Sequence, residues 1–164
     1  MTAPVSADLS TPRLRLVLQS HEEVRSMIER MSPYERAQVS PDWIRLLDAS
    51  SESSPWIHGY RMVLEESGEV IGNCGFKGPP ADGVVEIAYG VAPEVQGKGY
   101  ATEAAQALTD FARSFKEIRI IRAHTLPDGV ASQRVLAKCG YAHVGEVIDP
   151  EDGLVWRFEW VPIS

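Results

Sequence analysis

Cysteine is scarce in this chain of 164 residues, which carries only Cys74 and Cys139. The two are far apart in sequence and form no Cys-x-x-Cys pair, so we expect neither a disulfide framework nor a zinc site. Each lies among apolar neighbours, where a free cysteine usually behaves as a small buried hydrophobic residue. The pattern therefore predicts two buried, unpaired thiols.

Long hydrophobic runs are missing as well. No stretch approaches the roughly 18 consecutive apolar residues that a membrane-spanning helix needs. The first residues also lack the basic segment and apolar run of a secretory signal. We therefore expect a cytoplasmic protein that has no membrane partner.

Positive charge is in deficit, because 16 lysines and arginines face 23 aspartates and glutamates, for a net charge of −7. Nucleic-acid binding uses basic patches that contact phosphates, so the composition argues against nucleic acid as a dedicated partner. The negative charge is compatible with a positively charged substrate that acts as an acceptor, although many soluble proteins are acidic. The length favours a single domain over residues 1–164, long enough to bury a full core.

What the sequence does contain is a conspicuous stretch over residues 84–101. Its β-branched and aromatic residues predict a strand over residues 84–91, and Pro93 ends that strand because proline has no N–H for the ladder. A glycine-rich turn then leads directly into a helix. Free backbone N–H groups, the helix dipole and the small size of glycine make such a turn suited to binding phosphate.

Two common phosphate motifs do not match this turn. The Walker pattern needs glycine where Ala92 stands and serine or threonine where Gly99 stands. The dinucleotide fingerprint places Thr102 at its last small position and belongs to an early strand, whereas this strand lies past mid-chain. An ordinary turn and helix cap without a ligand is the plain structural alternative.

Hydrophobic spacing predicts the remaining elements, with alternation for strands and a period near 3.6 for helices. The expected strands are residues 11–18, 56–65, 69–76, 84–91, 118–125, 141–148 and 154–161. The expected helices are residues 21–31, 101–115 and a segment from Asp128, as its cap, to Cys139, with 41–47 as a candidate short helix. Residues 1–10 are expected to be frayed and 48–55 to form a polar loop. On the last strand, one face is expected to enter the core through Leu154, Trp156, Phe158 and Trp160.

The glycine turn resembles the acyl-CoA signature of the GNAT N-acetyltransferases, Gln/Arg-x-x-Gly-x-Gly/Ala, through Gln96, Gly99 and Ala101. The run Lys138-Cys139-Gly140-Tyr141 is similar to the Lys-x-Gly-Phe that ends a helix in the RimJ/RimL-like branch of that family. The opening of the same branch is matched by Thr11, Arg13, Leu14 and Leu16, although Val17 replaces a residue that is often basic. The resemblance spans nearly the whole chain.

This resemblance implies an α/β (α+β) fold in which helices flank a mixed, mostly antiparallel sheet of about six to seven strands. It implies an acyltransferase that moves the acetyl group of acetyl-CoA to a primary amine, on a protein N-terminus or a small molecule, by direct attack in a ternary complex. No metal is required, and the chain is expected to be a monomer or homodimer. The residues implied to hold the cofactor are Val91, Gln96, Gly97, Lys98, Gly99, Tyr100, Ala101 and Thr102, with the Val91 N–H as oxyanion donor.

Two positions depart from the family pattern. Gly129 stands where the branch usually has an asparagine that contacts the pantetheine arm. Leu136 stands where many members have a tyrosine as general acid. Ser132 is then the best hydroxyl to face the leaving thiolate, and a serine that only caps its own helix is the equal alternative.

An amine must lose a proton before it attacks a thioester, and a carboxylate or imidazole can take that proton directly or through water. Glu86 is the leading candidate, because it is a carboxylate in an apolar strand beside the cofactor turn, where burial would raise its pKa. A surface glutamate is the alternative. His58 and His124 are rivals on neighbouring strands, and for both we expect a structural or acceptor-binding role before a catalytic one.

Two other functions remain open from the sequence. One is an acyl-CoA-binding sensor without turnover, which the missing asparagine and tyrosine make worth considering. The other is a nucleotide-binding module. The acceptor is not determined, because the segment over residues 32–55, which lies over the acceptor site in the family, carries the least information.

Overall fold

A single mixed sheet of eight strands forms the centre of the computed structural model, which describes residues 8–161. The strands are β1 (Leu9–Ser10), β2 (Leu14–Leu18), β3 (Tyr60–Leu64), β4 (Val70–Phe76), β5 (Val84–Val91), β6 (Ile120–Thr125), β7 (Ala142–Asp149) and β8 (Gly153–Trp160). The helices are α1 (His21–Glu29), α2 (Pro33–Ala37), α3 (Pro41–Asp48), α4 (Tyr100–Arg113) and α5 (Val130–Lys138), with a 3-10 turn η1 (Pro93–Val95). This is the mixed, mostly antiparallel fold that the sequence predicts.

The strand order is β1-β2-β3-β4-β5-β6-β8-β7, and every neighbouring pair is antiparallel except β5 and β6. The parallel ladder between those two is short, running from Val84↔Ile120 to Glu86↔Arg122. The antiparallel ladder between β4 and β5 continues to Gly72↔Val91. The last residues of β5 are therefore paired with β4 on one side and not with β6 on the other.

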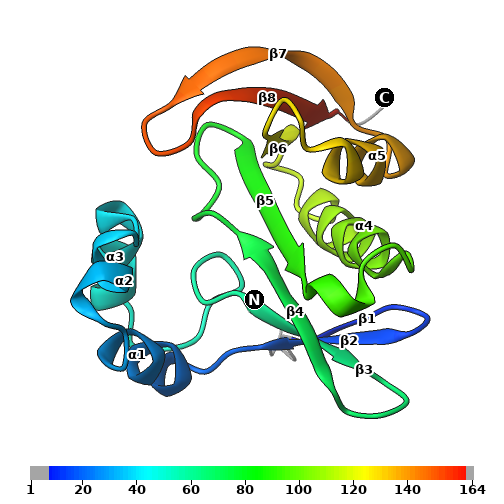
Figure 1. Ribbon diagram of the computed structural model, residues 1–164. Helices are drawn as coiled ribbons and strands as arrows, with labels where there is room; N and C mark the ends of the chain where they lie inside the picture. The colour runs from blue at the N-terminus through cyan, green and yellow to red at the C-terminus, as the bar shows by residue number, and fades with distance from the viewer. Residues whose placement is uncertain (1–7, 162–164) are drawn as a thin grey trace.

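The helices divide into two groups. α4 and α5 lie together on one side of β5, and α1, α2 and α3 form a separate group away from them (Figure 1). Helix α1 begins where Ser20 and Glu23 form a reciprocal capping box, which satisfies two backbone donors at the helix start. The same device, Ser32 with Glu35, starts α2. No helix in residues 8–161 is long and apolar enough to cross a membrane.

The main core lies between the sheet and α4. The apolar stripe of α4, which includes Ala104, Ala105 and Leu108, packs on Val85 and Ile87 of β5. Alternation along a strand places successive side chains on opposite faces. Val85 and Ile87 therefore point toward α4, and Glu86 between them points to the other face.

Several predicted details are wrong. The strand expected over residues 56–65 begins only at Tyr60, because residues 56–58 form a turn. Asp128 does not cap α5, whose N-cap is Gly129 without a side-chain bond. Leu154 is exposed, whereas the three aromatic residues expected beside it do pack on the core.

The helix α2 was missed, and so was β1. The two residues of β1 pair with β2 in a segment that we expected to be frayed, which raises the strand count to eight. Residues 1–7, the rest of that segment, lie outside the described part of the chain.

Candidate active site

The glycine turn has a backbone that only glycine adopts without strain. Gly97 and Gly99 have φ of +78° and +87°, in the left-handed region, where a side chain costs roughly 1–2 kcal/mol. Gln96 fastens the turn to the strand, since its Nε2 donates to the Val91 carbonyl at 3.0 Å. Gly99 is the N-cap of α4 and supplies no side-chain cap.

The amides at the start of α4 are open. The first intrahelical bond is donated by Glu103 to the Gly99 carbonyl, so the N–H groups before it have no partner in the helix. Within residues 8–161, no other group accepts a hydrogen bond from the amides of residues 97–102. The positive end of the α4 dipole adds to these donors, which makes the turn attractive to an anion.

A cleft of about 390 Å³ opens beside these amides, between the end of β5, the start of α4 and helix α5. Seven of the eight residues predicted to hold the cofactor line it: Val91, Gln96, Gly97, Gly99, Tyr100, Ala101 and Thr102. Lys98, the eighth, does not line it, and its carbonyl accepts a hydrogen bond from Arg13 instead. Ser132, predicted through the family resemblance as the hydroxyl nearest the leaving thiolate, does line it.

The cleft also contains basic residues that the sequence analysis missed. Arg134 and Lys138 of α5 line it together with Ala131 and Val135. Ala131, Arg134 and Lys138 are three and four positions apart and therefore lie on one face of α5. Ser132 is two positions from Arg134, so its assignment to the cleft gave no signal for either cation. Two cations opposite open amides favour a polyanionic ligand.

Tyr89 was missed too, and it lies directly against Ser132. The Tyr89 Oη is 2.9 Å from Ser132 Oγ and 3.2 Å from the Ser132 carbonyl, to which it donates. Burial raises the pKa of Tyr89 to about 12, so the phenol stays protonated at neutral pH. Leu136, at the position of the tyrosine usual in the family, is fully buried in the core.

The N–H of Val91 points away from β4. In the ladder the Ala92 N–H donates to the Ile71 carbonyl, and hydrogen-bonded pairs alternate with unbonded ones along an antiparallel pair. The Gly72↔Val91 pair is therefore an unbonded one. The Val91 N–H faces the side on which the β6 ladder has already ended, as the predicted oxyanion donor requires.

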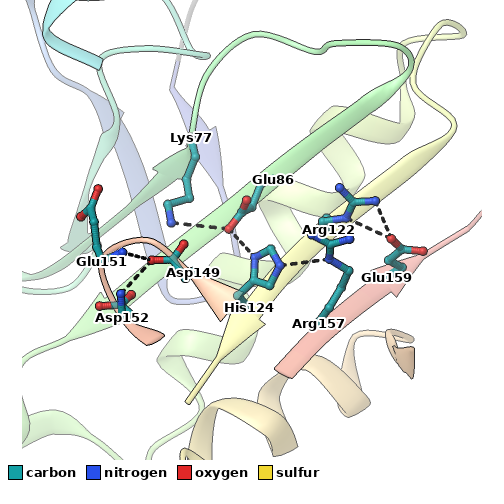
Figure 2. Close-up of polar contacts among 9 residues, drawn as sticks. All are labelled: Lys77, Glu86, Arg122, His124, Asp149, Glu151, Asp152, Arg157 and Glu159. Atoms are coloured by element: carbon teal, nitrogen blue, oxygen red, sulfur yellow. Dashed lines mark hydrogen bonds and ion pairs between the residues drawn. The ribbon is translucent and has the colours of Figure 1, made fainter. Parts of the chain in front are cut away.

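Glu86 lies on the opposite face of β5, in a cluster of charged and polar side chains (Figure 2). Its Oε2 is 2.8 Å from His124 Nδ1 and 3.5 Å from Lys77 Nζ. The Glu86 side chain is 25% exposed. The prediction that this carboxylate has apolar surroundings is thus wrong, because the neighbouring strands bring polar partners to it.

His124 is held in one tautomer by its two neighbours. Arg157 Nε donates to His124 Nε2 at 3.1 Å, and an arginine can only donate. The proton of a neutral imidazole is then on Nδ1, where it is donated to Glu86. The Asp149 carboxylate, whose pKa is lowered by the backbone N–H groups of Asp152 and Glu151, lies beside this cluster in Figure 2.

His58 is far less accessible, with only 2% of its surface exposed. The Ser54 N–H donates to His58 Nδ1, and His58 Nε2 lies 2.9 Å from His21 Nδ1. Burial, followed by the neighbouring His21, lowers the pKa of His58. Both ring nitrogens are therefore occupied by the protein, and neither is left for an acceptor.

The residues of the cleft fit coenzyme A. A Cβ at Gly97 would meet nothing within 4 Å, so the backbone is bare toward a ligand there, and the open amides and the two cations suit a pyrophosphate. Within residues 8–161, no three histidine, cysteine, aspartate or glutamate side chains gather to bind a metal ion.

Two curated relatives are N-acetyltransferases described as uncharacterized. One, p20 of Bacillus licheniformis, is 28% identical over 123 residues, which cover 74% of this chain and 68% of the relative. The other, YjdG of Bacillus subtilis (strain 168), is 35% identical over 81 residues, which cover 49% of this chain and 48% of the relative. The match thus spans about half the length of the second relative.

A solved structure of the aminoglycoside acetyltransferase AAC(6')-Ib, in complex with coenzyme A and kanamycin, has a similar fold. It aligns with a TM-score of 0.63 and 20% identity, over 89% of this chain and 93% of that one. The family model described as an acetyltransferase (GNAT) domain matches residues 3–142. The open-amide turn, the cleft beside it and this match agree, and the chain belongs to the GNAT acetyltransferase family.

Proposed function

We propose that this protein is an N-acetyltransferase that transfers the acetyl group of acetyl-CoA to a primary amine in a ternary complex. The observation that carries the proposal is the turn of residues 96–102. Its amides at 97–102 have no partner within residues 8–161, and the turn lines a cleft that also contains a serine hydroxyl and two cations. A plain helix cap does not need two left-handed glycines and a cleft of this size. The aminoglycoside acetyltransferase with the similar fold binds coenzyme A, which supports the same cofactor here.

The open amides of residues 97–102 would hold the pyrophosphate, with Arg134 and Lys138 supplying positive charge from α5. Acetyl-CoA, when bound, supplies an activated thioester whose carbonyl carbon is attacked by the amine. The Val91 N–H is suited to donate to the oxygen of that carbonyl, because it faces the side left open by β6. A donor fixed in advance stabilises developing negative charge more than a mobile one.

Glu86 is the proposed base. It lies on the face of β5 opposite the cleft, so it would take the ammonium proton of an acceptor that approaches from that face, directly or through one water. The Nδ1–H of His124 donates to the Glu86 carboxylate, and Lys77 Nζ lies 3.5 Å from the same Oε2. We assign His124 to orient Glu86, and we do not keep His58 as an acceptor contact because both its nitrogens are bonded.

Ser132 is the proposed proton donor to the departing sulfur, with Tyr89 behind it. The Tyr89 hydroxyl donates to the Ser132 carbonyl and contacts Ser132 Oγ, which fixes the serine rotamer. The RimJ/RimL-like branch is the finer assignment that we propose, from Thr11, Arg13 and the Lys138–Tyr141 run. For the acceptor we propose only the class of primary amines, which includes protein N-termini and small molecules.

A silent acyl-CoA sensor is the second candidate, because Gly129 and Leu136 still stand in place of the family's asparagine and tyrosine. Thiol release from acetyl-CoA, measured against a panel of peptide and small-molecule amines, separates the two. An enzyme releases CoA thiol in proportion to at least one amine, whereas a sensor binds acetyl-CoA and releases none. Stabilisation by ATP or NAD, with none by acetyl-CoA, would contradict both and favour a nucleotide-binding module.

A further inference from the structure

Arg13, the residue before β2, contacts the cofactor turn, although β3 and β4 separate β2 from β5 in the sheet. Its Nη2 donates to the Lys98 carbonyl at 2.8 Å, and its guanidinium lies 4.3 Å from the centre of the Tyr100 ring. Its Nε and its backbone N–H both donate to the Glu103 carboxylate. Arg13 thus contacts the glycine-rich loop at Lys98 and both ends of the first helical turn of α4, at Tyr100 and Glu103.

The bond to the Lys98 carbonyl fixes the direction of the next amide. The Lys98 C=O and the Gly99 N–H belong to one planar trans peptide, in which the two groups point in opposite directions. Because Arg13 holds the carbonyl, the Gly99 N–H is turned to the opposite side. Gly99 lines the cleft, so this orientation presents its N–H to a ligand there.

The bond to Glu103 has an electrostatic consequence. Glu103 stands in the first turn of α4, where a carboxylate competes with a bound anion for the same positive helix end. Burial opposes its ionisation, but hydrogen bonds from Thr11 and Arg13 outweigh that effect and lower the pKa of Glu103. The carboxylate is therefore charged at neutral pH, and Arg13 is the cation that compensates it.

We propose that Arg13 is a positioning residue for the cofactor, which orients the Gly99 N–H into the cleft and cancels the charge of Glu103 beside the pyrophosphate site. The inference rests on the proposed function, because it takes the ligand of the cleft to be coenzyme A. It predicts that Arg13 matters for the phosphate-bearing part of the ligand and not for the pantetheine arm.

The test is calorimetry of CoA, and NMR titration of pantetheine, which lacks the phosphates, with the wild type and four variants. Arg13→Ala should weaken CoA by at least about tenfold, the worth of one charge-assisted hydrogen bond, and change pantetheine by less than about twofold. Adding Glu103→Gln to Arg13→Ala should recover part of the CoA affinity. Arg61→Ala is the matched control, because Arg61 also pairs with a surface glutamate, Glu23, away from the turn.

Arg13→Lys keeps the charge without the planar fork, so it should retain more CoA affinity than Arg13→Ala while the Gly99 amide resonance of the free protein moves in both. If the wild type binds CoA and Arg13→Ala binds it equally well, the role of Arg13 is overturned and the proposed function stands. The role is also overturned if CoA and pantetheine weaken equally, or if Glu103→Gln brings no recovery. If the wild type binds no CoA, the proposed function and this inference fail together.

Discussion

The two faces of β5 bear different kinds of machinery. On the α4 side, the cleft is built mainly from backbone, with two left-handed glycines, open amides and the Val91 N–H. On the other side, the Glu86 cluster is built from long side chains that four different elements or loops bring together. A site built from backbone tolerates many side-chain substitutions but little change in backbone conformation. A cluster built from side chains depends instead on the identity of each side chain.

The largest effect is expected on the side-chain face. Glu86→Gln keeps size and hydrogen-bonding capacity but removes the base, so kcat/KM should fall by at least about 10²-fold near pH 7. The loss should shrink as pH rises, because more of the amine then arrives deprotonated. Steady-state rates with an amine from the panel measure this, and calorimetry should show unchanged acetyl-CoA affinity.

Glu69→Gln, at an exposed position before β4, is the control for loss of one negative charge. A Glu86→Gln enzyme within about threefold of the wild type at pH 7, well below the usual worth of a general base, would remove Glu86 from the base role. Catalysis would then fall to His124 or to a water chain on the same face.

On the backbone face, Gly99→Val should weaken acetyl-CoA by at least about tenfold, equivalent to about 1.4 kcal/mol. Its φ of +87° disfavours a β-branched residue, and a Cβ there would lie 3.1 Å from Arg13 Nη2. Gly68→Val is the matched control, because Gly68 has φ of +77° with nothing within 4 Å of its Cβ position. Both variants should lose stability in thermal unfolding, and only Gly99→Val should lose affinity in calorimetry.

Tyr89→Phe tests whether the cleft depends on side chains as well. Loss of its hydroxyl should lower kcat/KM by about three- to tenfold, the range of one net hydrogen bond, with little change in acetyl-CoA affinity. Tyr141→Phe is the control, since the Tyr141 hydroxyl bonds Thr109 in the core at 2.7 Å. If the two variants lower stability alike and neither lowers turnover, the Tyr89–Ser132 contact only joins β5 to α5.

The smallest effect concerns neither face but the buried His58 and its neighbour His21. Burial lowers the pKa of His58 below its ordinary value of 6.5, so the folded protein binds fewer protons than the unfolded chain as pH falls through that value. The free energy of unfolding should therefore decrease as the pH falls from 7.5 to 5.5. His58→Gln should flatten this dependence in thermal unfolding, and the exposed His143→Gln should leave it unchanged. An equally steep profile in His58→Gln would assign the effect to other groups.

The same contrast explains what the sequence could predict. The turn was readable because its requirements are local: two glycines, a proline and a helix start within ten positions. Period-two and helical spacing gave seven of the strands and most helix bounds. Ser132 was reached through the family resemblance, because Leu136 stands in place of the usual tyrosine. Tyr89 was missed although alternation placed it on the same face as Val91.

The Glu86 cluster was not readable in the same way. Glu86 and His124 were each recognised as candidates, but their contact depends on β5 and β6 lying side by side, and Arg157 arrives only through the β6–β8 register. His58 was wrongly placed on a strand, because the residues of its turn alternate as a strand does. Arg13 shows the same limit, since nothing near residue 13 in the sequence indicates contact with residues 98–103.

Binding of acetyl-CoA at the turn of residues 96–102 can be followed through the amide chemical shifts of the labelled protein during titration with acetyl-CoA. We expect the largest shifts at the amides of Gly97, Gly99 and residues 100–102, with a second group at Val91 and Ser132. The amides of β7 should move little. Shifts concentrated elsewhere, or no saturable shift at millimolar acetyl-CoA, would contradict the assignment of the cleft.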